Sequence, residues 1–162
     1  MLGKAKLAIS AVKVAAGRVA MDAIERKTRR DGKLLAAYLL LCAVLLVPIA
    51  LSYGLAPAEV LPKALDIGVE GNDQIQIFRA LMCLYLAASL FWAIAAFRSD
   101  WQRPAAVWAM LFSASLAIGR IVSLAVDGPA STLLDLYLGL EIFGAALGLG
   151  LLAYTRPNRS RR

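Results

Sequence analysis

Three ionisable residues, Arg79, Arg120 and Glu141, lie inside apolar segments long enough to cross a membrane. A charged side chain at the centre of a bilayer costs at least ~2.5 kcal/mol on insertion scales, so such a residue usually pairs with another or serves a function. Arginine suits a pair of this kind because its guanidinium stays charged and can bond both oxygens of one carboxylate. These three residues are therefore the first candidates for chemistry in this chain.

The segments that must position them are strongly apolar. The chain has 162 residues, of which 60% are hydrophobic. Its apolar runs are too long and too uniform for the alternating strands of ~10 residues found in membrane β-barrels. We predict an all-α integral membrane protein with a four-helix transmembrane bundle over residues 34–154. Its four spans each reach the ~20 residues that cross a ~30 Å hydrocarbon core and cover residues 34–53, 75–97, 105–126 and 133–154.

The net charge of +7 follows the membrane topology. Nine Lys and Arg precede the first span, two lie in a tight turn at residues 98–104 and four in the tail, whereas the two opposite loops hold Lys63 alone. This positive-inside pattern predicts that both termini lie in the cytoplasm. No aromatic residues interleave with the basic ones as in nucleic-acid-binding surfaces, so we expect no nucleic-acid partner.

Residues 1–33 are predicted to form a basic amphipathic helix outside the bundle. On this reading the helix lies on the cytoplasmic membrane surface, with its basic residues near anionic lipid headgroups. An arm that docks on a partner protein is the alternative. Residues 155–162 form a short basic tail.

In this topology the three intramembrane charges lie at similar depth, roughly 6–12 Å below the outer surface at 1.5 Å of rise per residue. They can form a buried ion-pair network, for which Asp135 supplies a second anion, and Ser123 and Asp127 share a helix face with Arg120. Small residues indicate the faces where helices approach closely. These helix-packing candidates are Ser115 and Gly119 on the third span and Gly144 and Gly148 on the fourth.

Three interpretations of this cluster remain open. In the first, Arg79 reaches outward to the membrane surface and Arg120–Glu141 only staples two helices together. In the second, the cluster binds a small polar ligand, a lipid headgroup or an ion. In the third, Glu141 takes part in proton-coupled work.

The chain contains no histidine, which removes the commonest ligand of haem and metals and the usual general base. We therefore expect no metal site, no cofactor and no enzymatic activity. An enzyme with Glu141 or Asp135 as general acid is the third-ranked function. Cys42 and Cys83 both fall near the membrane midplane, where they are expected to be inert small apolar residues. A metal or redox pair is the alternative.

Two runs of residues resemble a known family. They are NDQIQIFRA from Asn72 to Ala80, with YLA and LFW after it, and GRIVSLAVDGP from Gly119 to Pro129, followed by Tyr137 and Glu141. Both are similar to a bacterial four-span membrane family catalogued as a domain of unknown function (the 4345 type), over about residues 34–154. The resemblance implies that Arg79, Arg120, Asp127 and Glu141 belong to the family pattern, and it implies no activity or cofactor. Residues 1–33 lie outside it.

We expect a non-enzymatic accessory or structural membrane protein. Its partners are the lipid bilayer and either other integral membrane subunits, for example of a larger energy-converting complex, or further copies of itself. The alternative is a small transporter or lipid- or ligand-binding protein that uses the outer Arg/Glu site. A water-filled pocket touching both arginines favours the alternative, and dry packing favours the structural role.

Overall fold

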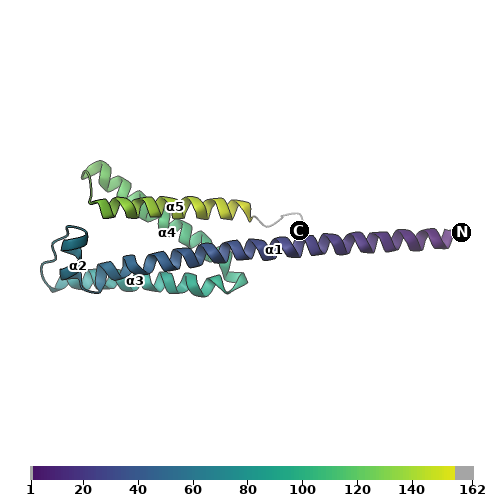
Figure 1. Cartoon of the computed structure of the whole chain (residues 1–162), viewed down its shortest axis with the longest axis horizontal. Coiled ribbons are helices and arrows are strands. Elements are labelled where there is room, and N and C mark those ends of the chain that lie inside the picture. Colours follow the sequence, from purple (N-terminus) through teal and green to yellow (C-terminus); the bar gives the residue numbers. More distant parts are fainter. Residues whose placement is uncertain (1, 156–162) are drawn as a thin grey trace. The chain divides into compact units, whose positions relative to one another are not determined.

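The computed structural model describes the backbone of residues 2–155 and the side chains of residues 17–155. This part of the chain is helical, without strands (Figure 1). Four helices are long and apolar enough to cross a membrane, α1 through its residues Gly17–Gly54, which confirms the all-α four-span class. Most of the basic tail, residues 156–162, lies outside the described residues. The helices are α1 (Leu2–Gly54), α2 (Pro57–Ala64), α3 (Asn72–Ala96), α4 (Ser99–Val126) and α5 (Thr132–Tyr154).

The chain divides into two compact units, residues 1–34 and 35–162. The first unit belongs to helix α1, and its side chains at residues 17–30 are all exposed. The backbone of α1 is helical from Leu2 to Gly54, so this one element includes both the predicted surface helix and the first span. The side chains of residues 1–16 lie outside the described residues, so the amphipathic surface helix stays a prediction.

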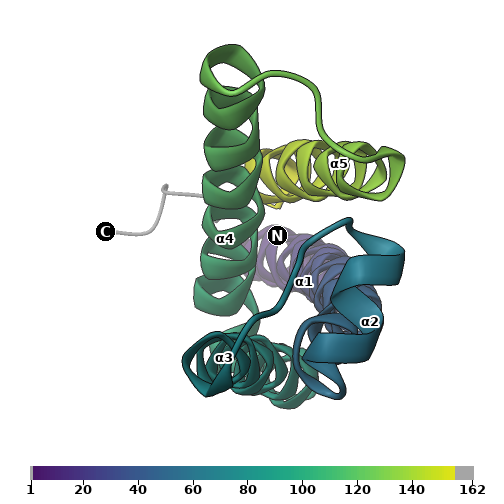
Figure 2. The ribbon, with the colours of Figure 1, turned by 90° about the vertical axis from the view of Figure 1, so that its left-hand side faces the viewer.

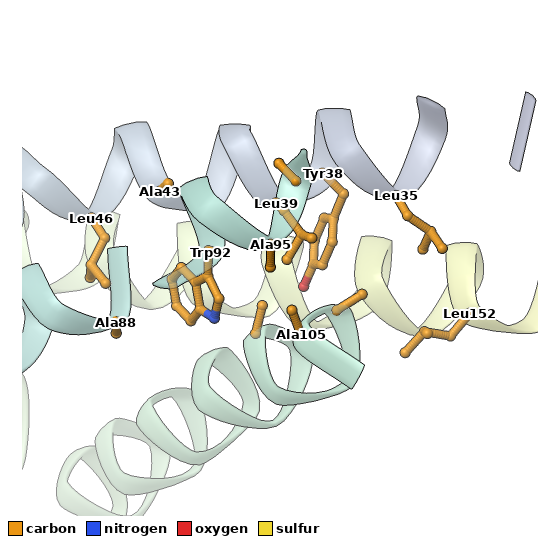
Figure 3. Packing of buried hydrophobic residues seen from close by; sticks show 13 residues of the cluster. Leu35, Tyr38, Leu39, Ala43, Leu46, Ala88, Trp92, Ala95, Ala105 and Leu152 are labelled. Carbon is orange, nitrogen blue, oxygen red and sulfur yellow. The ribbon is translucent and has the colours of Figure 1, made fainter. Parts of the chain in front are cut away.

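In the second unit, α3, α4, α5 and residues 35–54 of α1 surround one apolar core. Figure 2 looks nearly along α3 and α5 and shows α4 lying across them. Trp92 of α3 and Leu39 of α1 are fully buried between the helices, as Figure 3 shows. A row of buried alanines lets α3 and α4 approach closely, and α4 packs most extensively against α5. These alanines are Ala95, Ala96, Ala105, Ala106 and Ala109.

The short helix α2 begins at Pro57, at the first helical position, where its missing N–H costs nothing. Its residue Leu61 is fully buried and packs in a second apolar cluster with Leu65 and with Tyr137 of α5. This cluster joins the connection between α1 and α3 to the α5 helix. It lies beside the charged residues described next.

The turn between α3 and α4 is shorter than predicted, since only Phe97 and Arg98 separate the two helices. The side-chain amide of Gln102 donates to the backbone oxygen of Ala96 at 2.8 Å and so satisfies a carbonyl at the end of α3. The expected turn at residues 98–104 is therefore wrong over most of its length. Ser99 and Asp100 are typical of a helix N-terminus and mark the earlier start of α4.

Candidate functional site

The central feature of the bundle is an ion pair between α4 and α5. Nε of Arg120 donates to both carboxylate oxygens of Glu141, at 2.9 Å each. The two side chains are only 20% and 11% exposed. At 1.5 Å of rise per residue, Arg120 lies about 9 Å from the end of α4 and Glu141 about 14 Å from the start of α5. The pair therefore joins the two helices well inside their apolar length.

Three tyrosines surround this pair. The guanidinium carbon of Arg120 lies 5.7 Å from the centre of the Tyr137 ring, a distance typical of cation–π contact. Tyr53 lies within electrostatic reach of the guanidinium, and Tyr85 within reach of both charges. The rings of Tyr53 and Tyr85 also pack edge to face, with centroids 6.1 Å apart. Sequence reasoning missed Tyr53, because nothing in the apolar pattern of α1 tells which side of the helix faces α4.

Arg79 does not join the network. Its side chain is exposed on α3, and among the residues whose side chains the structure describes none forms a hydrogen bond or ion pair with it. At 100° per residue, Arg79 lies on the side of α3 opposite the buried Ala88. Of the three interpretations, this position corresponds to the first, in which Arg79 reaches outward, because the rotation of α3 turns it away from Arg120.

Asp135 does not pair with an arginine either. It is exposed in the first turn of α5, and no described cation lies within 4.0 Å of its carboxylate. Ser123 and Asp127, which share the α4 face of Arg120, bond to each other: the Ser123 hydroxyl donates to the Asp127 carboxylate at 2.7 Å. Arg120, Ser123 and Asp135 nevertheless line one pocket of about 270 Å³ at the end of the bundle that carries the α4–α5 loop.

The glycines of α5 form a slot for a tyrosine of α1. The Tyr38 hydroxyl donates to the backbone oxygen of Gly144 at 3.0 Å, and a Cβ added at Gly148 would overlap that hydroxyl. A Cβ at Gly144 would come within 3.1 Å of the hydroxyl oxygen of Ser113 on α4. Both glycines therefore lie at helix contacts, and the close approach at Gly148 requires glycine.

The small residues of α4 behave differently. Ser115 and Gly119 are exposed, and a Cβ added at Gly119 would meet nothing within 4 Å. Gly119 lines the polar pocket beside α5. Neither residue lies at a close helix contact like that at Gly148, because α4 turns its buried alanines toward its neighbours.

A second arginine joins α4 to α5 at their other end. One terminal nitrogen of Arg103 donates to the backbone oxygen and hydroxyl of Thr155, at 3.0 and 3.2 Å, and the other donates to the backbone oxygen of Leu152 at 3.2 Å. These bonds satisfy carbonyls at the C-terminus of α5, where a cation is also favoured by the helix dipole. Sequence reasoning placed Arg103 in a turn and missed this contact.

The two charges of the ion pair line different pockets. Glu141 lines a mainly apolar pocket of about 70 Å³ together with residues of α1, α3 and α4, Cys42 and Trp92 among them. Arg120 lines the more polar pocket at the α4–α5 loop. Arg79 lines neither of these two pockets.

The acidic and cysteine side chains do not converge. Cys42 is half-buried and Cys83 is exposed on another helix. Within residues 17–155, no group of three or more His, Cys, Asp or Glu side chains is placed to hold a metal ion. Several polar groups inside the bundle instead form contacts that connect two helices, as Arg120–Glu141 and Tyr38–Gly144 do.

Comparison with known proteins gives one match. A family model described as "Domain of unknown function (DUF4345)" matches residues 34–152, which overlap all four membrane-length helices and include both members of the ion pair. None of the curated proteins and none of the solved structures matches the chain. The four-helix bundle built around Arg120 and Glu141 thus belongs to the DUF4345 family.

Proposed function

We propose that this chain is a non-enzymatic accessory or structural protein of the bacterial inner membrane, whose bundle packs against other integral membrane helices. These helices are subunits of a larger assembly or further copies of the chain itself. In hydrocarbon, side-chain hydrogen bonds and small residues hold helices together, because lipid leaves no hydrophobic drive between them. A protein built mainly to pack uses its intramembrane polar groups in that way.

The polar groups of the bundle support this proposal. Arg120 and Glu141 join α4 to α5, and Tyr38 joins α1 to α5. The buried Ser89 hydroxyl of α3 donates to the backbone oxygen of Ala43 on α1 at 2.8 Å. Each of these groups joins two helices of the bundle, as expected for a protein built to pack in a membrane.

The exposed position of Arg79 is the observation that carries the proposal. It is the eighth residue of α3, about 11 Å along the helix, and its side chain is exposed on the surface that faces the bilayer. Such a residue either extends to the headgroups or pairs with a carboxylate of another chain. Short exposed side chains on the same face let a second helix approach. These neighbours are Ala80, Cys83 and Ala87.

We infer that a partner helix covers this face of α3 and supplies a carboxylate to Arg79. Pairing of Arg79 with this carboxylate then favours association, because an unpaired arginine in hydrocarbon is costly and the pairing removes that cost. A partner on another chain also accounts for the position of Arg79 outside the ion pair of the single chain.

The orientation of the protein is part of the proposal. Fifteen Lys and Arg stand on the side that holds both termini, against Lys63 on the other, which supports cytoplasmic ends by the positive-inside rule. Residues 1–33 then lie where anionic headgroups attract their basic side chains.

Purification from the native membrane in a mild detergent tests the proposal, with bound proteins identified and counted by mass spectrometry. We expect stoichiometric membrane subunits, or a second copy, with the unaltered chain. Arg79→Gln should lose them while its melting temperature stays unchanged. Lys63→Gln, an exposed cation on the same side of the membrane in our orientation, is the matched control and should retain them. A monomer without protein partners, or full retention by Arg79→Gln, would overturn the proposal.

A further inference from the structure

The pocket at the α4–α5 loop has an unusual combination of charges. It has a volume of about 270 Å³ and lies between the C-terminal half of α4 and the first turns of α5. Its polar lining consists of Arg120, Ser123 and Asp135, and its apolar lining includes Leu124, Leu134 and Leu138. A cation and an anion thus share one space of mixed polarity.

Arg120 keeps hydrogen-bonding capacity toward this pocket. A guanidinium has five N–H donors, and both bonds between Arg120 and Glu141 use Nε alone. Tyr53 lies within electrostatic reach of the same group, and its hydroxyl can take one further donor. Terminal N–H groups therefore remain for an acceptor in the pocket, where phosphate oxygens fit the planar fork of arginine.

Asp135 offers the opposite charge. Its side chain is exposed, and it forms no ion pair with any cation in residues 17–155, Arg120 included. Asp127 adds a second carboxylate close by, since it accepts the hydroxyl hydrogen of Ser123, which lines the pocket. A purely anionic ligand would be repelled by these carboxylates, and a purely cationic one would leave the remaining N–H donors of Arg120 without an acceptor. The arrangement therefore favours a ligand that carries both charges.

We propose that this pocket binds a phosphate group linked to a primary ammonium group, as in the headgroup of phosphatidylethanolamine. The phosphate accepts hydrogen bonds from the terminal nitrogens of Arg120, and the ammonium donates to Asp135. A primary ammonium has three N–H donors for a carboxylate, whereas the quaternary ammonium of a choline headgroup has none.

The depth of the pocket agrees with a lipid headgroup. Asp135 is the fourth residue of α5 and Arg120 lies six residues before the end of α4, which places them about 5 and 9 Å from the helix ends. This is the zone where the hydrocarbon core meets the polar headgroups. The leucines of the lining then contact the glycerol and the first carbons of the acyl chains. The site requires no partner protein and is separate from the α3 face that carries Arg79.

The test uses the purified full chain in nanodiscs made from equal parts of phosphatidylethanolamine, phosphatidylcholine and phosphatidylglycerol. Lipids retained after transfer to detergent are counted by native mass spectrometry. We expect preferential retention of phosphatidylethanolamine. Asp135→Asn should lower that preference about fivefold, the range of a partly exposed charge pair, without lowering the melting temperature. The matched control is Asp73→Asn, which removes an exposed carboxylate in the first turn of α3 and should change nothing.

A second arm distinguishes the two sources of the same chemistry. Soluble phosphoethanolamine is added to the detergent-solubilised chain, and its binding is measured by calorimetry. Binding that Asp135→Asn weakens would support the pocket with a soluble ligand in place of a lipid. Equal retention of the three lipids together with no binding of phosphoethanolamine would overturn the proposal, as would a preference that Asp135→Asn leaves intact.

Discussion

Replacement of Glu141 by glutamine should loosen the α4–α5 contact more than any exposed carboxylate replacement does. Glutamine keeps the size of the side chain and one acceptor for Nε of Arg120, but it removes the negative charge that both 2.9 Å contacts use. The guanidinium is only 20% exposed. It would therefore remain charged in a largely apolar setting with a weaker partner.

The size of the effect follows from the geometry. Removing one partner of a fully buried pair costs ~3–5 kcal/mol, and a hydrogen bond to a charged group contributes ~1.5–3 kcal/mol. Because glutamine still accepts one bond, and because the Tyr137 ring still faces the guanidinium, we expect a loss of about 2 kcal/mol. Asp100→Asn is the matched control, since Asp100 is exposed and its closest polar contact is 3.4 Å from Ser99.

The assay is thermal or denaturant unfolding of the purified chain in one detergent. Equal stability of Glu141→Gln and Asp100→Asn would refute the buried-pair reasoning. A double variant, Arg120→Leu with Glu141→Leu, sharpens the test. Removing both charges of a buried pair is often neutral or stabilising, so this variant should be more stable than Glu141→Leu alone. If it were instead less stable, the pair itself would contribute more than its desolvation costs.

Three further predictions concern other contacts. Gly148→Ala should destabilise the bundle by about 1–3 kcal/mol, because the added methyl group overlaps the α1 tyrosine. Gly150→Ala, whose added Cβ meets nothing within 4 Å, should stabilise it slightly. Equal shifts of the two melting temperatures in detergent would contradict the close approach of that tyrosine to Gly148. Arg103→Gln should lower the free energy of unfolding by about 2 kcal/mol, because it removes three hydrogen bonds at the end of α5. Arg98→Gln, at an exposed position, should leave the stability unchanged. Melting curves in the same detergent compare the two variants, and equal melting temperatures would contradict this role of Arg103. Deletion of residues 1–30 should leave the bundle folded, because residues 35–162 form their own compact unit. The deletion should weaken binding of the protein to anionic vesicles or to a partner. If the shortened chain failed to insert into the membrane, this segment would be required for folding.

The predicted spans agree closely with α3 and α5, and less well at the starts of α1 and α4. The third span was predicted to begin at residue 105, whereas α4 begins at Ser99. A span predicted from hydropathy ends where charged residues occur, but the helix itself can continue through such residues outside the hydrocarbon core. Arg103 was therefore counted with a turn, although it caps α5. The predicted N-terminal helix and the first span both belong to one element, because the backbone is helical from Leu2 to Gly54.

The candidate site was predicted only in part for a different reason. Arg79 and Arg120 have similar depth in the sequence, but depth depends on position along a helix and pairing depends on rotation about it. Helices that are apolar nearly all round carry little information about rotation. The tyrosines around Arg120 and the exposed Ser115 and Gly119 could not be placed for the same reason.

The sequence by itself determined the number of spans, the helical class and the presence of charges in the apolar region, because a bilayer of ~30 Å leaves the backbone few other solutions. Only the tertiary structure decided which charges meet. The rotation and crossing of α3 and α4 turn Arg79 outward, bring Arg120 onto Glu141 and open the pocket beside Asp135. Those choices depend on how alanine, glycine and tyrosine side chains pack across helix contacts, and that packing is a property of pairs of helices and not of any one segment.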